Sequence, residues 1–86
     1  MMTLQELLAS PDCWTQRAFA RNVYGDVVSA DSPTAVRWCL LGALLHCRLS
    51  EQTYQELLKK AGTGLVSFND THTHAEVLAL VTELQL

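Results

Sequence analysis

Asn69 and Asp70 are the two neighbouring polar residues whose types and position best suit chemistry. They follow an aromatic residue and precede a helix start at Thr73, so their side chains could position a ligand or a catalytic water. Asn and Asp before a helix also bind loop amides and the helix N-terminus, and we favour this structural role. If the chain carries a site, its candidate binding residues are Trp14, Asn69, Asp70 and Thr73.

A second chemistry to consider is nucleophilic catalysis by a cysteine. Cys39 and His46 lie on one predicted helix, and a neighbouring base can generate the reactive thiolate. Two helical turns separate them, roughly 10 Å along the axis, so they cannot form a direct hydrogen bond. His72 or His74 could serve instead, but Cys39 stands among leucines and is more simply a packed core thiol. We therefore predict no catalytic residue and favour a protein that is not an enzyme.

The cysteines and histidines could also be metal ligands. They contain no Cys-x-x-Cys pair and no His-x-x-x-His pair, whereas a structural zinc site needs four convergent ligands. The odd number of cysteines suits reduced thiols better than a disulfide framework. We expect no metal site and no cofactor. The residues concerned are Cys13, Cys39, Cys47, His46, His72 and His74.

Charge and hydropathy argue against two classes of partner. The net charge is −3, and only six Lys and Arg residues are present, with no basic run to neutralise phosphates. We therefore expect neither nucleic acid nor a membrane as a partner. The longest apolar run is less than half of the ~20 residues needed to span a bilayer, and the N-terminus lacks the basic start of a signal peptide. The sequence thus predicts a cytoplasmic protein with a single domain, residues 1–86.

A buried central helix is predicted at residues 33–48. The stretch from Ala35 to Cys47 has its hydrophobic groups at helical spacing and on the opposite side as well, so several elements must cover it. Pro33 suits the first helical position, where its missing N–H costs little. Gly42 is expected to be a point of close packing, because an absent side chain lets another backbone approach.

A small β-hairpin is predicted at about residues 14–28. Residues 14–21 alternate in a way that fits a strand, and Asn22-Val-Tyr-Gly25 fits a turn followed by a bulge. A helix that ends at Gly25 is the alternative for this stretch.

The remaining elements complete a mainly helical α+β fold with about four helices, and an all-α fold is the alternative. Thr3-x-x-Glu6 and Thr73-x-x-Glu76 are capping boxes that open the first helix, at residues 4–9, and the last one. A surface helix begins after Ser50 and ends at the glycines that follow it. Residues 65–68 are read as a short extended piece.

These motifs resemble those of an uncharacterised family of small bacterial and phage proteins, known as a domain of unknown function. The resemblance covers most of the chain from Trp14 onward and implies a fold but no activity. Phe68 stands where the family usually has Trp, and His72 where it commonly has Arg. The matching stretches are Trp14-Thr15-Gln16, Asn22-Val-Tyr-Gly25, Ala35-Val-Arg-Trp-Cys39-Leu-Leu-Gly42-Ala43-Leu44, Asn69-Asp70 and Thr73-His-Ala-Glu76-Val77-Leu78.

For the function we predict binding to another protein, as a modulator of host machinery in a phage or accessory-gene setting. The alternative is a small ligand-binding or hydrolase-like domain centred on Asn69, Asp70 and Cys39. A deep pocket lined by these three would favour the alternative, and an exposed apolar patch would favour interaction. We also expect a two-fold homodimer, because the helices at residues 3–9 and 73–86 carry more leucine than one seam needs.

Overall fold

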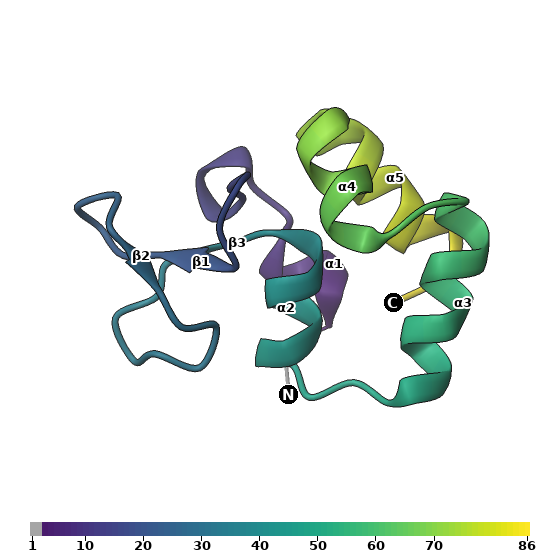
Figure 1. Ribbon diagram of the computed structural model, residues 1–86, viewed down its shortest axis with the longest axis horizontal. Coiled ribbons are helices and arrows are strands. Elements are labelled where there is room, and N and C mark those ends of the chain that lie inside the picture. The colour runs from purple at the N-terminus through teal and green to yellow at the C-terminus, as the bar shows by residue number, and fades with distance from the viewer. Residues whose placement is uncertain (1–2) are drawn as a thin grey trace.

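The computed structural model describes residues 3–86, which form five α-helices and a small antiparallel sheet. Figure 1 shows α3, α4 and α5 on one side of the molecule, the sheet on the other, and α1 and α2 between them. The mainly helical α+β prediction is confirmed, with one helix more than expected, and the all-α alternative is wrong. No helix within these residues is long and apolar enough to cross a bilayer. The helices are α1 (Leu4–Leu7), α2 (Leu40–His46), α3 (Glu51–Ala61), α4 (Leu65–Thr71) and α5 (His74–Glu83).

The sheet has three strands in the order β2-β1-β3. Its strands are β1 (Ala20–Arg21), β2 (Val27–Val28) and β3 (Arg37–Trp38), and a 3₁₀ turn, η1 (Pro11–Cys13), precedes them. Ala20 pairs with Val28 on one side and with Trp38 on the other. Because paired residues share a face of a sheet, these three face the same way, and the burial of Ala20 and Trp38 identifies it as the inner face.

The turn of the predicted hairpin is confirmed. The Asn22 side-chain oxygen accepts the N–H groups of Tyr24 at 2.9 Å and Asp26 at 3.0 Å. Gly25 has φ +85°, a conformation that favours glycine because it lacks a Cβ. The backbone of Asn22 closes the turn with two further hydrogen bonds, to Gly25 and Asp26.

The hairpin strands are shorter than the predicted range of 14–28. Residues 14–19 form no regular strand, and only Trp14 makes an isolated bridge, to Trp38. Arg17 has φ +63°, which no strand residue adopts, so the backbone leaves the extended course there. The alternation of polar and apolar side chains predicted a strand across residues 14–21, but the left-handed conformation of Arg17 interrupts it.

The predicted central helix at residues 33–48 is wrong in its first half. The helix begins only at Leu40, because the Cys39 sulfur accepts the N–H of Gly42 at 3.2 Å and caps the first turn. Pro33 lies in a turn closed by a hydrogen bond from Ala35 N–H to the Ser32 carbonyl at 3.1 Å.

The segment before α2 is extended because it pairs with β1. Val36 N–H donates to the Arg21 carbonyl at 2.9 Å, and Cys39 N–H donates to the Phe19 carbonyl at 3.1 Å. These bonds satisfy backbone groups that a helix would otherwise pair within itself. Hydrophobic periodicity cannot distinguish a buried strand from a buried helix. Here the segment is extended because it pairs with β1, which lies earlier in the sequence.

Residues 65–68 are helical, so the predicted extended piece is also wrong. Gly64 is the N-cap of α4, and Phe68 N–H donates to the Gly64 carbonyl at 2.9 Å. Leu65 and Asn69 are both buried, which fits residues four apart on one face of a helix. Gly62 ends α3 in the left-handed conformation, φ +76°, as predicted.

Both capping boxes are confirmed. Thr73 N–H donates to a Glu76 carboxylate oxygen at 2.9 Å, and the Thr73 hydroxyl accepts Glu76 N–H at 3.2 Å. The same reciprocal pair joins Thr3 and Glu6, although α1 is shorter than the predicted residues 4–9. The hydrogen bonds from the threonines lower the pKa of both glutamates.

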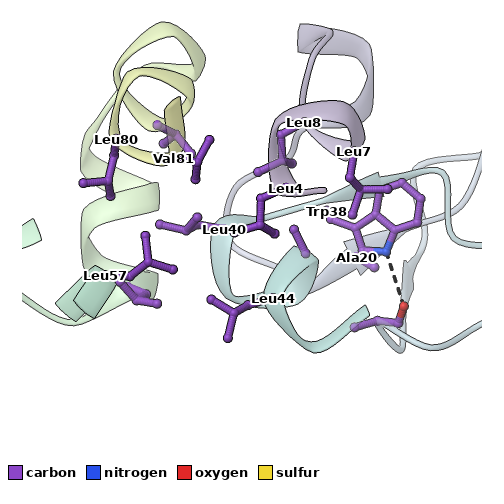
Figure 2. Packing of buried hydrophobic residues seen from close by; sticks show 14 residues of the cluster. Leu4, Leu7, Leu8, Ala20, Trp38, Leu40, Leu44, Leu57, Leu80 and Val81 are labelled. Atoms are coloured by element: carbon purple, nitrogen blue, oxygen red, sulfur yellow. Dashed lines mark hydrogen bonds between the residues drawn. The ribbon is translucent and has the colours of Figure 1, made fainter. Parts of the chain in front are cut away.

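The hydrophobic core lies between the helices and the inner face of the sheet, where Ala20 and Trp38 join the leucines of α1 and α2 (Figure 2). Leu4 N–H donates to the Leu86 carbonyl at 2.9 Å, so the first and last turns of the chain pack together. The leucines of these turns cover the core of one chain, which removes the leucine surplus that motivated a dimer. Dimerisation itself stays a prediction. The largest fully buried apolar side chains are Leu4, Leu8, Leu40, Leu57, Val77 and Val81.

Gly42 is the point where the sheet region touches α2. A Cβ at this position would lie 1.9 Å from the Phe19 carbonyl oxygen and 2.7 Å from its carbon. The atoms in the way are backbone, so they cannot move aside as a side chain would. The predicted close packing at Gly42 is therefore present, and its neighbour is the segment that leads into β1.

We expect Gly42→Ala to lower the free energy of unfolding by about 2 kcal/mol or more, because even a single methyl group overpacks this contact. Urea denaturation measures the change. Gly64→Ala is the control: a Cβ there meets nothing within 4 Å, and only the poorer N-cap of α4 should count against it, at about 1 kcal/mol or less. Equal stability of the two variants would contradict the close approach of α2 and Phe19.

Candidate functional site

The side chain of Asn69 joins three parts of the chain at one buried point. Its oxygen accepts the Trp14 indole N–H at 2.7 Å and the backbone N–H of Leu40 at 2.9 Å. Its amide nitrogen donates to the Thr15 carbonyl at 3.0 Å and to an Asp70 oxygen at 3.2 Å. Two donors and one acceptor oxygen are thus all used, and the residue is fully buried. Asn69 fastens the start of α2 and the segment after η1 to α4.

Gln16 adds a second attachment between the same segments. Its side-chain nitrogen donates to the carbonyls of Asn69, at 3.0 Å, and His72, at 3.1 Å. The carbonyls at the end of a helix have no partner within the helix, and Gln16 supplies one for α4. Consecutive residues from Trp14 to Gln16 therefore all bind the end of α4.

Asp70 holds the backbone of Arg17 in its unusual conformation. One Asp70 carboxylate oxygen accepts the Arg17 N–H at 2.9 Å, and the same oxygen receives the Asn69 amide. A left-handed conformation is unfavourable for a residue with a Cβ, so it persists only where such contacts enforce it. The pair places the Arg17 side chain on the surface, next to a groove.

An open groove of about 480 Å³, which we call the Arg17 groove, lies beside this network. Its walls are mainly apolar, and Arg17 and Asp70 are its charged residues. Asn69 does not line it, because its side chain is turned into the protein and fully bonded. The groove is lined by Arg17, Ala18, Phe19, Cys39, Val66 and Asp70.

Cys39 reaches the groove but is almost completely buried, with 2% of its surface exposed. Burial raises the pKa of its thiol, and the N–H of Gly42 offsets this only in part. Burial also raises the pKa of Cys47. A raised pKa leaves less thiolate at neutral pH, so neither residue has the environment of an activated nucleophile. Cys13, Cys39 and Cys47 are all free thiols.

Each histidine binds a backbone carbonyl. His46 lies 3.0 Å from the Ala30 oxygen, His72 2.8 Å from the Phe68 oxygen, and His74 2.6 Å from the Leu8 oxygen. A carbonyl only accepts, so the ring nitrogen in each pair carries the proton. Within residues 3–86, no three His, Cys, Asp or Glu side chains converge as metal ligands.

The structure brings together three of the four candidate binding residues. Trp14, Asn69 and Asp70 belong to one hydrogen-bond network, whereas Thr73 caps α5 and takes no part in it. Sequence reasoning missed Arg17, which no local motif marks as left-handed. Val23 and Tyr24, at the centre of the Asn-x-x-Gly turn, could have been recognised as exposed, because side chains at the centre of a hairpin turn point into solvent.

The most exposed large apolar side chains lie elsewhere, on the hairpin. Tyr24 is 86% exposed, Val23 73% and Val27 65%, the highest values among the large apolar residues described. We call these three residues the hairpin surface. Figure 1 shows the hairpin extending away from the helices of residues 3–86.

Residues 3–84 match the model of DUF6197, a family of unknown function, and the chain therefore belongs to that family. The resemblance to an uncharacterised domain is thereby confirmed. No curated protein and no solved structure shows significant similarity to the chain.

Asn69→Ala should lower the free energy of unfolding by about 2–5 kcal/mol. The change leaves the Trp14 indole and the Leu40 N–H without their acceptor, and each unsatisfied buried group costs about 1–3 kcal/mol. Urea denaturation followed by tryptophan fluorescence measures it. Gln55→Ala, which removes an exposed amide bound only to Glu51, should change stability by about 0.5 kcal/mol or less. An Asn69→Ala variant as stable as this control would show that the network is unimportant.

Ellman's reagent at neutral pH should label Cys13 first and leave Cys39 largely unreacted. The reactive species is the thiolate, and burial both covers Cys39 and raises its pKa, so its labelling should become faster as the pH rises. Cys13→Ser should remove the fast phase of the reaction, and Cys39→Ser should keep it. Rapid labelling of Cys39 at neutral pH is the result that this structure does not allow.

Proposed function

Because the family to which the chain belongs has no known activity, we propose a function from its surface: the protein binds another protein through the hairpin surface. The observation that carries this proposal is the exposure of Val23, Tyr24 and Val27 on one projecting hairpin. Adjacent exposed apolar side chains typically mark an interaction site. Tyrosine is also among the residues that contribute most to binding energy in protein interfaces.

The hairpin is held rigid by its own hydrogen bonds, which favours a role in binding. The Arg21 guanidinium donates to the Gly25 carbonyl at 2.9 Å and to the Thr15 hydroxyl at 2.9 Å. The Asn22 side chain fixes the other side of the turn. A surface that is already ordered loses less conformational entropy on association.

The same geometry gives less support to the ligand-binding or hydrolase alternative. Of the three residues on which that alternative was centred, Asn69 has every polar group bonded inside the protein. Cys39 is covered, and its thiol pKa is raised. Of these three residues, only Asp70 offers an unburied polar group to the Arg17 groove, and one carboxylate does not supply a nucleophile together with its base.

A small protein that binds through one hairpin would act by occupying a surface of its partner. We propose that it modulates a host protein in this way. We further propose that it acts in the cytoplasm, since its three free cysteines suit a reducing compartment.

Affinity capture tests the proposal with three forms of the full chain. The native chain, a Val23→Ser/Tyr24→Ser variant and a Leu45→Ser control are immobilised and exposed to an extract of the organism that encodes the protein. Leu45 is a good control because it is an exposed apolar residue on α2, away from the hairpin. Bound proteins are quantified by mass spectrometry.

We expect a protein that binds the native chain and the control but is lost with the hairpin variant. Truncating an interface residue of this kind costs about 2 kcal/mol or more, which is roughly thirtyfold in affinity. Urea denaturation should show equal stability for all three forms, since the changed side chains are exposed. The same captured proteins in the same amounts on all three forms would contradict a binding role for the hairpin.

A further inference from the structure

We infer that the hairpin of one copy docks into the Arg17 groove of a second copy, and reciprocally, so that the chain forms a two-fold dimer. This inference rests on the proposed function, because it names the partner of the hairpin surface. The inserted part is the hairpin tip, residues 23–26. The receiving part is the groove, with the exposed side chains of Phe19 and Val66 in its walls.

The groove suits an aromatic side chain in size and rigidity. Its volume of about 480 Å³ lies within the roughly 300–1,000 Å³ of typical binding pockets, so the Tyr24 ring can enter it. The backbone of Phe19 is pressed against Gly42, and that of Arg17 is held by Asp70. These contacts hold one wall of the groove before any ligand arrives.

The groove also offers a partner for the Tyr24 hydroxyl. The hydrogen bonds that Asp70 receives from residues 3–86 all go to one carboxylate oxygen, Oδ1, which leaves Oδ2 free. The Tyr24 hydroxyl has no partner within the same residues. A phenol that donates to a carboxylate forms a strong, charge-assisted hydrogen bond.

Charge complementarity fixes the orientation of the tip. Asp26 lies two residues beyond Tyr24, and Arg17 stands at the rim of the groove. Both residues are exposed, and the ion pair found within residues 3–86 involves neither of them, because it joins Lys60 and Glu83. An inserted tip would therefore bring an unpaired carboxylate to an unpaired guanidinium.

The position of the groove allows the contact to close on itself. The chain runs from Arg17 and Phe19 into β1 and the hairpin, so the groove lies at the end of β1 next to α2 and α4, and the tip lies at the other end, away from the helices (Figure 1). A two-fold axis that places the sheet regions of two copies side by side in opposite directions pairs each tip with the other groove. One tyrosine buries roughly 150–250 Å², so even two reciprocal contacts bury less than the ~1,200 Å² of a stable interface. We expect a weak dimer.

A charge-swap experiment tests this dimer. Light scattering and sedimentation equilibrium are recorded over a dilution series for the native chain, for R17E, for D26R and for an equimolar mixture of the two variants. Neither side chain makes a hydrogen bond within residues 3–86, so both variants should fold, and urea denaturation checks this. Arg48→Glu, an exposed arginine outside the groove, is the control.

The native chain and the control should form dimers, and each variant alone should dimerise roughly tenfold or more weakly, because like charges then meet at both contacts. The mixture should recover the dimer: the native Asp26 of one chain meets the native Arg17 of the other, and the two introduced residues attract each other. Tyr24→Ser should also weaken the dimer, and Tyr24→Phe less so.

A monomeric native chain at every concentration would overturn the inference, as would open-ended growth in mass or a mixture no stronger than its components. These outcomes leave the proposed function open to its own test. If a foreign protein is still captured only by chains with an intact hairpin, the hairpin binds that protein, and self-docking alone is wrong.

Discussion

The four hydrogen bonds of one buried amide, that of Asn69, are the interaction on which the rest of this structure depends. α4 carries the amide, and its partners are a tryptophan side chain, a backbone carbonyl in the irregular segment, the first N–H of α2 and the neighbouring Asp70. A fully satisfied polar group in a small core fixes relative positions in a way that leucine contacts, being non-directional, do not. The helical side and the sheet side of the molecule are aligned through it.

Asp70 transmits this alignment to the surface. Its backbone follows Asn69 in α4, and its carboxylate holds Arg17 in the left-handed conformation. The chain then turns toward Phe19, whose carbonyl meets Gly42 and receives the N–H of Cys39. The shape of the groove and the direction of the hairpin thus follow from contacts that start at the end of one short helix.

The elements that sequence reasoning predicted correctly are those whose signals are local. The capping boxes at Thr3 and Thr73, the turn at Asn22 and the end of α3 at Gly62 each depend on residues within about four positions. The errors lie where distant partners decide. Residues 36–39 are extended because they hydrogen-bond to β1 and to Phe19 before it, and residues 65–68 are helical although valine and phenylalanine suit a strand. Asn69, Asp70 and Trp14 could be selected from the sequence as polar or aromatic outliers. Their contact could not be predicted, because more than 50 residues separate Trp14 from the other two.

The amide of Asn69 also limits which residue can occupy its position. Aspartate has the same reach but no donor for the Thr15 carbonyl when ionised, glutamine is one methylene longer, and serine or threonine has one hydroxyl for four bonds. Leucine has the volume but leaves an indole and a backbone N–H without partners. None of these residues can form all four bonds that asparagine forms at position 69. The identity of this single side chain therefore carries information about positions far apart in the sequence, because its four bonds align α4 with the start of α2 and with the segment after η1.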